Sequence, residues 1–369
     1  MVKSIVWLSS IMLCVVANTA ISGTLGLPPV PIPKDNLQTD EKIRLGDRLF
    51  HDVRFSADGK VNCATCHEKS KGFTDNLKVS KGFNNLTGTR NAPTVINSAF
   101  YTSLFWDGRE PDLEGQSKQP FINPVEGGLH DHTPIIEVIR NDQEYLKGFK
   151  TVFDIEATDI TIDHVAKAIA SFERTVISGD SPFDQYLYAG DRSAMTESQV
   201  RGLAVFRNKG RCVSCHTIEQ TQALFTDNRF HNIGIGFKAI QGKEALTAKE
   251  MVKKKQRGAD VDVTVLTQLN MSELGRFAVS ENVTEVGAFK TPTLRNIDIT
   301  QPYMHDGSLE TLEDVVDFYN NGGRVAVSDT LSDFQSGGIR PLDLNDQEKN
   351  DLVAFMKALT SPEYMTQAK

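Results

Sequence analysis

The sequence has no long apolar run outside its N-terminal segment, although the chain is 369 residues long. No later stretch approaches the roughly 20 apolar residues of a transmembrane helix, so we expect no membrane span. The chain also has no excess of positive charge, since its formal net charge is −8, which argues against a nucleic-acid partner. Few stretches alternate as β-strands do, and VDVTVL (261–266) is one of them. These shortages predict a mainly α fold with long loops.

The N-terminal segment, residues 1–22, is typical of a secretory signal peptide. Lys3 precedes an apolar run (5–16), and small residues follow this run. The run is too short to cross a membrane. We therefore expect an exported, periplasmic protein whose mature part begins with an extended, Pro-rich lead-in at 23–38.

Cysteine is scarce, because there are only five and one of them lies in the expected signal peptide. The other four form two CxxCH motifs, made of Cys63, Cys66 and His67, and of Cys212, Cys215 and His216. Paired cysteines in an exported chain also suit disulfides, redox dithiols or zinc. Neither a disulfide nor a dithiol requires the adjacent histidine, and zinc requires four ligands at each site. Two thiols at this spacing bond to the vinyl groups of one haem while the histidine binds its iron, so we expect two covalently bound haems c.

Each CxxCH motif follows a similar predicted helix. TDEKIRLGDRLF (39–50) and TESQVRGLAVF (196–206) share a threonine cap, an acidic first turn, a glycine and a terminal phenylalanine. This internal repeat predicts two similar haem domains, the first closed by an amphipathic helix at 161–177. The expected boundaries are an N-terminal domain at 39–177, a linker at 178–191, a C-terminal domain at 192–335, and a last helix within 336–369 that packs back on the body.

A second iron ligand is missing near the first motif. After His67 there is no histidine until His130 and no methionine until Met195, and the nearby nitrogen donors, Lys71, Lys78 and Lys81, suit the surface. Iron with an open face binds small molecules, so the first haem is the predicted site of chemistry. Peroxide cleavage also needs a group that takes a proton from one oxygen and gives it to the other. The candidate distal groups are Gln116, Glu126, His130 and His132.

Tryptophan is equally scarce, because Trp106 is the only one outside the expected signal peptide. It lies in a Gly/Pro-rich region between the two motifs. This position suits either a core residue or a redox relay, and the residues alone leave both interpretations open.

A capped amphipathic helix is predicted within HDGSLETLEDVVDFYNNGG (305–323). Thr311 and Asp314 resemble a capping box, and two glycines can end the helix. Its apolar stripe consists of Leu312, Val315, Val316 and Tyr319. Tyr319 is therefore expected to point inward, either as part of the core or as a ligand.

From about residue 35 to 360 the chain resembles the bacterial dihaem cytochrome c peroxidase/MauG family. The motifs that carry the resemblance are RNAPTVINSAF (90–100), FWDGREPDLEGQ (105–116), FHNIG (230–234), FKTPTLRNIDITQPYMHDGS (289–308) and TLEDVVDFYNNGG (311–323). The resemblance implies two cytochrome-c-like helical domains, each with one haem c, and a calcium ion between the haems.

The resemblance also implies roles for single residues. Trp106 matches the family's inter-haem tryptophan. Gln116 and Glu126 match its distal glutamine and its catalytic glutamate. The matched calcium ligands, oxygen donors of the kind that suits this ion, are Asn91 and the backbone oxygens of Thr300 and Pro302.

Two departures from the reductively activated peroxidases favour the MauG-like branch. Those enzymes carry a histidine that blocks the first haem, but the corresponding loop here, VSKGFNNLTGT (79–89), has none. They carry a methionine on the second haem where this chain has Tyr319, as MauG-like members do. A phenolate favours ferric or higher iron, whereas a thioether favours ferrous iron. The alternative ligands of the second iron are Met271, Met304, His231 and His305.

These features predict a dihaem peroxidase that reduces hydrogen peroxide at the open N-terminal haem, stores oxidising equivalents on the Tyr-ligated second haem, and oxidises a partner protein at long range. MauG has a surface tryptophan two residues before its second CxxCH, where this chain has Gly210, so the partner or its docking face is expected to differ. One alternative is a cytochrome c peroxidase that removes peroxide with a small electron-donor protein, either a cytochrome or a cupredoxin. A second alternative is a non-enzymatic dihaem electron carrier.

Overall fold

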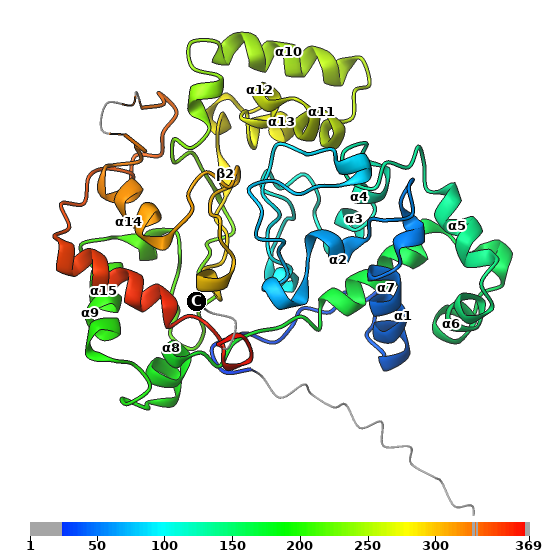
Figure 1. Ribbon diagram of the computed structural model, residues 1–369, viewed down its shortest axis with the longest axis horizontal. Helices are drawn as coiled ribbons and strands as arrows, with labels where there is room; N and C mark the ends of the chain where they lie inside the picture. The colour runs from blue at the N-terminus through cyan, green and yellow to red at the C-terminus, as the bar shows by residue number, and fades with distance from the viewer. Residues whose placement is uncertain (1–23, 327–328, 330, 366–369) are drawn as a thin grey trace, which may run out of the picture.

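The structure is a computed structural model, and it describes residues 24–326, 329 and 331–365. The described part is mainly helical, as predicted, and its two short strands, β1 (Phe230–His231) and β2 (Phe289–Lys290), pair antiparallel. Figure 1 shows two helical halves side by side, with a third group of helices across the top. None of the described helices is both long enough and apolar enough to cross a membrane. The expected signal peptide lies outside the described residues.

The N-terminal half contains α1 (Asp40–Phe50), α2 (Cys63–Cys66), α3 (Leu113–Gln116), α4 (Gln119–Ile122), α5 (Thr133–Arg140), α6 (Gln143–Phe153) and α7 (Ile162–Glu173). The C-terminal half contains α8 (Pro182–Asp184), α9 (Glu197–Arg207), α14 (Leu312–Asn320) and α15 (Asp346–Lys357). The group across the top contains α10 (Glu244–Gln256), α11 (Val261–Thr267), α12 (Leu269–Ser272) and α13 (Phe277–Ser280).

Helices α1 and α7 pack closely at a glycine. Thr39 caps α1, because its side chain accepts a hydrogen bond from the backbone N–H of Lys42. A Cβ on Gly46 would lie 1.9 Å from the backbone oxygen of Ala168, so a larger residue would force the two helices apart. The core of this half includes Leu49, Phe50, Val165 and Ile169.

Helices α9 and α15 repeat this arrangement in the C-terminal half. Thr196 caps α9. A Cβ on Gly202 would lie 1.9 Å from the backbone oxygen of Asp351 in α15. Phe206, like Phe50 of α1, is buried at the end of its helix. The threonine, glycine and phenylalanine of the sequence repeat therefore have the same three roles in both halves: cap, close helix contact and core.

The segment expected to be a linker, 178–191, packs partly into the C-terminal half. Phe183 is fully buried in the core of that half. Asp184 is also fully buried, and its carboxylate accepts hydrogen bonds of 2.8 and 2.9 Å from the guanidinium of Arg295. Such pairing offsets the cost of burying both charges.

Helices α10 to α13 have a small core of their own and contact the N-terminal half. Their buried side chains include Met251, Val265, Met271, Leu274 and Phe277. The hydroxyl of Thr89 donates a hydrogen bond of 2.7 Å to the backbone oxygen of Val265 in α11. This group of helices therefore reaches across to the other half of the molecule.

The prediction of a strand at VDVTVL (261–266) is wrong, because this stretch forms helix α11. The carboxylate of Asp260 caps the helix by accepting hydrogen bonds from the N–H groups of Asp262 and Val263, at 2.7 and 3.3 Å. The adjacent Val265 and Leu266 are both buried, as a helix allows and a half-exposed strand does not. The cap and the packing outweigh the local preference of the valines for a strand.

Helix α14 begins and ends as the sequence predicts. Thr311 and Asp314 form a reciprocal capping box at its start. Gly322 and Gly323 follow its end with φ of 72° and 82°, a conformation that suits glycine. Its apolar stripe, including Tyr319, lines a cavity in the C-terminal half.

Candidate functional site

A first cavity lies in the N-terminal half, beside helix α2. Cys63, Cys66 and His67 lie on its mainly apolar lining. The side chain of Asn62 caps α2 and so holds the turn that carries both thiols. Nδ1 of His67 donates a hydrogen bond of 3.1 Å to the backbone oxygen of Phe73, which leaves the lone pair of Nε2 free for a metal.

A second cavity, in the C-terminal half, has the same arrangement. Cys212, Cys215 and His216 lie on its lining, and its volume of about 520 Å³ is typical of a site for a small molecule or cofactor. Nδ1 of His216 donates a hydrogen bond of 2.8 Å to the backbone oxygen of Phe225. Nε2 of this imidazole is therefore also free to bind a metal.

The donor groups of both cavities fit a haem c. All four thiols are free, so neither pair forms the disulfide that an exported chain allows. Burial raises the pKa of the Cys66 and Cys212 thiols to about 12 and lowers the pKa of both imidazoles, which stay neutral. A neutral imidazole keeps the lone pair that iron requires. Two thiols and one imidazole on an apolar lining are the groups that attach and ligate a haem c.

One set of metal-ligating side chains lies close together in the described part of the chain, formed by Cys215, Asp227 and His231. Nε2 of His231 is hydrogen-bonded to the carboxylate of Asp227 at 2.8 Å. Cys215 is already a thiol of the second CxxCH motif. Three donors, of which two are engaged in this way, do not make the four-ligand site of a structural zinc.

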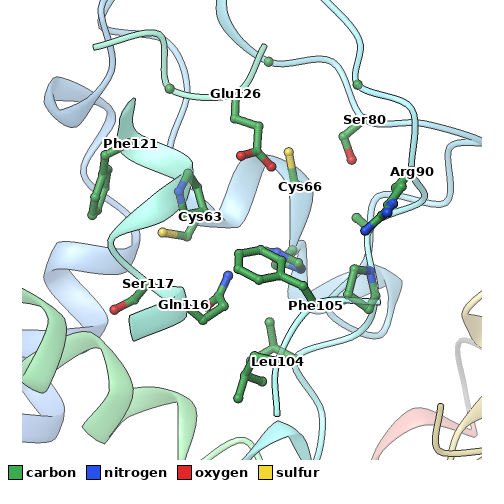
Figure 2. A pocket seen from close by; sticks show the side chains of 18 of the residues that line it. Cys63, Cys66, Ser80, Arg90, Leu104, Phe105, Gln116, Ser117, Phe121 and Glu126 are labelled. Atoms are coloured by element: carbon green, nitrogen blue, oxygen red, sulfur yellow. The ribbon is translucent and has the colours of Figure 1, made fainter. Parts of the chain in front are cut away.

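Gln116 and Glu126 face the first cavity from two different elements. Gln116 ends helix α3, and Glu126 lies in the loop after α4. Figure 2 shows both side chains pointing toward the space beside Cys63 and Phe105. The structure thus brings together the two residues that the resemblance singled out.

The two histidines that were also candidate distal groups lie elsewhere. His130 is exposed, and neither it nor His132 lies on the lining of the first cavity. The Nε2 atom of His132 lies 3.0 Å from the backbone oxygen of Lys118. Neither histidine is placed to act on a molecule in the cavity.

Glu126 lies in an apolar setting with one oxygen unsatisfied. Its Oε2 is buried and has no hydrogen-bond partner in the part of the chain that the structure describes. The pKa of Glu126 is raised to about 8, chiefly by burial and also by the carboxylate of Asp262, while the guanidinium of Arg109 opposes this shift. A carboxyl group with a pKa near neutrality can both accept and return a proton.

The first cavity offers few groups that bind iron. Among the described residues, His67 is the only histidine on its lining, which includes no methionine, lysine or tyrosine. The loop 79–89 contributes only Ser80, Gly82 and Gly88 to the lining. An iron held by His67 would therefore have no second strong protein ligand in this cavity.

Trp106 lies between the two cavities and is part of the lining of both, as are residues 91–94. Its indole N–H donates a hydrogen bond of 2.9 Å to the backbone oxygen of Asn91. Its own backbone oxygen accepts one of 2.8 Å from the N–H of Lys290 in β2. Its ring lies edge-on to that of His305, with 6.5 Å between ring centres. The indole is thus held in one orientation between the cavities.

The three calcium candidates, Asn91, Thr300 and Pro302, lie together on the lining of the second cavity. The side-chain amide of Asn76 donates hydrogen bonds of 3.0 and 2.8 Å to the backbone oxygens of Ile299 and Gln301. The backbone oxygens of Thr300 and Pro302, the residues that directly follow these two, accept no hydrogen bond from the described residues. Two free carbonyl oxygens and one amide side chain are a donor set that suits calcium.

Tyr319 lines the second cavity from helix α14. Burial raises the pKa of its phenol, and the thiols of Cys212 and Cys215 raise it further. Two other tyrosines on the same lining have partners: the hydroxyl of Tyr303 donates to a backbone oxygen at 3.0 Å, and that of Tyr101 accepts from a backbone N–H at 2.9 Å. The hydroxyl of Tyr319 has no such bond to the described residues.

The competing ligands of the second iron are placed less favourably. Met271 is fully buried in the core of the α10–α13 group and is not part of the cavity lining. His231 and His305 line the cavity, but their Nε2 atoms are hydrogen-bonded to Asp227 at 2.8 Å and to Glu273 at 2.9 Å. Met304, which also lines the cavity, is the remaining alternative to Tyr319.

A buried chain of charges, not predicted from the sequence, lies beside the first cavity. Arg90 pairs with Asp107 at 2.6 Å, Asp107 pairs with Arg109 at 2.9 Å, and Arg109 pairs with Asp262 at 2.6 Å. Arg90, Asp107 and Arg109 lie in the motifs RNAPTVINSAF (90–100) and FWDGREPDLEGQ (105–116). Their opposite charges are a feature of the sequence from which ion pairs can be predicted. Asp262 gave no such signal, because it lies in the stretch whose pattern favours a strand.

Two further buried groups that face the cavities were also missed. Glu173 of α7 lines the first cavity, and burial raises the pKa of its carboxyl to about 8. Lys290 of β2 lines the second cavity, and burial lowers the pKa of its amine to about 7. The ammonium of Lys290 lies 3.3 Å from the centre of the Tyr101 ring. Only the fold shows that these ordinary charged residues are buried.

The chain is similar to a family model, to two relatives and to one solved structure. The family model for di-haem cytochrome c peroxidase matches residues 40–193. The cytochrome-c peroxidase IdrP1 of Pseudomonas sp. (strain SCT) is 38% identical over 341 residues, which cover 91% of this chain and 85% of that protein. The methylamine utilization protein MauG of Methylorubrum extorquens is 35% identical over 330 residues, which cover 89% of this chain and 81% of MauG. A solved structure of a MauG-like protein associated with microbial copper homeostasis is similar with a TM-score of 0.74 and 32% identity, over 91% of this chain and 94% of that one.

Proposed function

This chain belongs to the dihaem cytochrome c peroxidase family, and within that family we propose that it is a MauG-like peroxidase that oxidises a partner protein at long range. Membership makes it an oxidoreductase, a peroxidase that carries haem c. One observation supports the assignment to the MauG-like branch of the family. Among the described residues of the first cavity, His67 is the only histidine, no methionine, lysine or tyrosine is present, and Gln116 and Glu126 face the same space.

Each haem has its own proposed set of protein groups. The proposed holders are Cys63, Cys66 and His67 for one haem, and Cys212, Cys215, His216 and Tyr319 for the other. When bound, the first haem supplies the iron at which hydrogen peroxide is reduced, and the second holds an oxidising equivalent. The free hydroxyl of Tyr319 supports its role as a ligand, and a metal can displace the phenol proton despite the raised pKa.

Glu126 is proposed to transfer a proton within the peroxide, and Gln116 to orient it. The carboxylate of Glu126 takes the proton from one peroxide oxygen and returns it to the other, which leaves as water. Its pKa of about 8 suits this double task, because both protonation states are accessible near neutrality. The amide of Gln116 orients the peroxide by hydrogen bonding. Apolar neighbours such as Leu104 and Phe105 keep bulk water away from these groups.

Trp106 is proposed to carry electrons between the two cavities. Its N–H donates to the backbone carbonyl of Asn91, which is not basic enough to remove the proton. The indole can therefore lose and regain an electron without losing its hydrogen. A calcium ion bound by Asn91, Thr300 and Pro302 would fix the backbone that holds the indole.

The proposal also includes a location and partners. The expected signal peptide supports export to the periplasm. The proposed reactants are hydrogen peroxide and a protein, which is either the substrate that is modified or the donor of electrons. Gly210, on the lining of the second cavity, stands where MauG has a surface tryptophan, so we infer a different docking face.

A cytochrome c peroxidase served by a small cytochrome or a cupredoxin is the second candidate. The 38% identity to IdrP1, which is named as such a peroxidase, favours it. The third alternative, an electron carrier without enzymatic activity, is set aside because the family is one of peroxidases.

Turnover with a soluble donor distinguishes the two candidates. The enzyme is mixed with peroxide and either a reduced small cytochrome or a reduced cupredoxin, and the steady-state rate is recorded. The MauG-like proposal predicts slow, unsaturated oxidation of both donors by the wild type and faster oxidation by Tyr319→Met, because a thioether favours reduction of the second iron. Fast, saturable turnover by the wild type would overturn it in favour of the second candidate.

A further inference from the structure

Asp262 lies in helix α11, outside the N-terminal half, and contacts residues of that half beside the first cavity, although it is not itself part of the cavity lining. Asp262 is buried, with only 5% of the residue exposed. One oxygen of its carboxylate accepts a hydrogen bond of 2.8 Å from Nε of Arg109. The other oxygen accepts a short hydrogen bond from the side-chain amide of Asn123. Asp262 therefore ties together two segments that are separate in sequence and that both border this cavity.

Asn123 and Arg109 each hold a residue that faces the cavity. The backbone oxygen of Asn123 accepts a hydrogen bond of 3.1 Å from the N–H of Glu126, and its side-chain oxygen accepts one of 3.1 Å from the N–H of Val125. The guanidinium of Arg109 lies 3.5 Å from the centre of the Phe105 ring, which Figure 2 shows beside Gln116. Through these two partners, Asp262 helps to fix the positions of Glu126 and Gln116.

The charges around Glu126 are balanced without it. Arg90, Asp107, Arg109 and Asp262 alternate in sign along the buried chain, so their charges cancel. Glu126 comes in addition, with Oε2 buried and unsatisfied. The charges of Asp262 and Arg109 both act on its carboxyl group, and Arg109 lines the same cavity. The other titratable or charged groups on the cavity lining are Cys63, Cys66, His67, Arg90 and Glu173. An added negative charge on Glu126 is costly here, because no unpaired positive charge remains to offset it.

We propose that Asp262 is a positioning residue for Glu126: through Asn123 it holds the loop that carries Glu126, and by pairing with Arg109 it keeps the positive charge of that guanidinium from stabilising an ionised Glu126. This inference rests on the proposed function only for the catalytic role of Glu126. The link between the two carboxyl groups follows from the contacts of the described residues alone. According to this proposal, helix α11 contributes to the site in the N-terminal half.

The first test compares Asp262→Asn with Asp260→Asn in the holoenzyme. Asp262→Asn leaves Arg109 unbalanced, which favours ionised Glu126. The pH limb of kcat/KM assigned to Glu126 should therefore move to lower pH by about one unit or more. Asp260 is exposed on the same helix and asparagine also caps helices, so Asp260→Asn removes the same charge while leaving the helix intact. An unmoved limb in Asp262→Asn, or an equal shift in both variants, would overturn the proposal.

The second test reads the Glu126 proton directly and needs neither peroxide nor activity. Infrared spectra of the holoenzyme at neutral pH should show the carbonyl stretch of a protonated buried carboxyl group that is absent in Glu126→Gln. That band should lose about half of its intensity or more in Asp262→Asn and keep its full intensity in Asp260→Asn. If the wild type has no such band, the inference fails even where Asp262→Asn does not fold. If the bands behave as expected but the enzyme does not turn over peroxide, only the proposed function fails.

Discussion

The indole N–H of Trp106 donates to the backbone oxygen of Asn91 at 2.9 Å, and both residues line both cavities. The N–H of Asn91 donates in turn to the backbone oxygen of His305 at 2.8 Å, in the C-terminal half. The position of the proposed electron relay thus depends on a contact between the two halves. The same asparagine is a candidate calcium ligand, so relay and ion site share one residue.

Replacement of Trp106 by phenylalanine should slow oxidation of the electron donor without slowing the reaction with peroxide. Phenylalanine keeps a ring but is much harder to oxidise, and it loses the bond to Asn91, at a cost of about 1 kcal/mol in the free energy of unfolding. Stopped-flow spectroscopy should show peroxide reacting at the first cavity at an unchanged rate while oxidation of the electron donor slows sharply. A donor rate equal to that of the wild type would exclude Trp106 as the relay.

The pH dependence of turnover should report Glu126. Its carboxyl group acts as a base only when ionised, so kcat/KM should rise with pH and level off above a pKa of about 8. In Glu126→Gln this limb should vanish and the rate should fall by about 10²- to 10⁴-fold. Glu110→Gln is the matched control, because burial also raises the pKa of Glu110 but this residue does not line the cavity. If the same rise of kcat/KM with pH persists in Glu126→Gln, another group must cause it.

Removal of the Tyr319 hydroxyl should change the second iron alone. We expect the low-spin signal in the resting EPR spectrum to change in Tyr319→Phe, because one ligand of that iron is lost. Tyr303→Phe removes another hydroxyl from the same lining, one that donates to a backbone oxygen, and should leave the signal unchanged. An unaltered signal in Tyr319→Phe would direct attention to Met304.

Chelation should destabilise the protein if calcium binds at Asn91. Calcium at 100 times its dissociation constant stabilises a folded protein that binds it by about 2.7 kcal/mol. Removal of calcium by EGTA should therefore lower the melting temperature by several degrees. Asn91→Ala should melt at the lower temperature from the start and respond little to EGTA. Equal responses of the wild type and the variant would place any calcium elsewhere.

The parts of the site that can be predicted from the sequence depend on local chemistry. The thiol spacing of CxxCH matches the haem vinyl groups, and the period and cap of α14 turn Tyr319 inward. Thr39 and Gly46 recur as Thr196 and Gly202, which makes the paired helices of the two halves recognisable.

The parts that cannot be predicted depend on contacts between distant segments. Asp262 meets the side chain of Asn123, which is 139 residues away in sequence, and nothing in either local pattern indicates that contact. The capped α11 likewise overrides the strand preference of its valines. Asp184 looks like an ordinary linker residue until Arg295 is found beside it, fully buried.

Addition of peroxide to the resting, fully oxidised holoenzyme tests the central claim most directly. Because the described lining of the first cavity has no second histidine and no methionine, lysine or tyrosine to block the iron, peroxide should react at once, without an electron donor. The measurement is the haem absorbance in a stopped-flow instrument, with and without prior one-electron reduction. Immediate spectral change and peroxide consumption in the unreduced sample are the predicted result. A reaction that begins only after reduction would contradict the account.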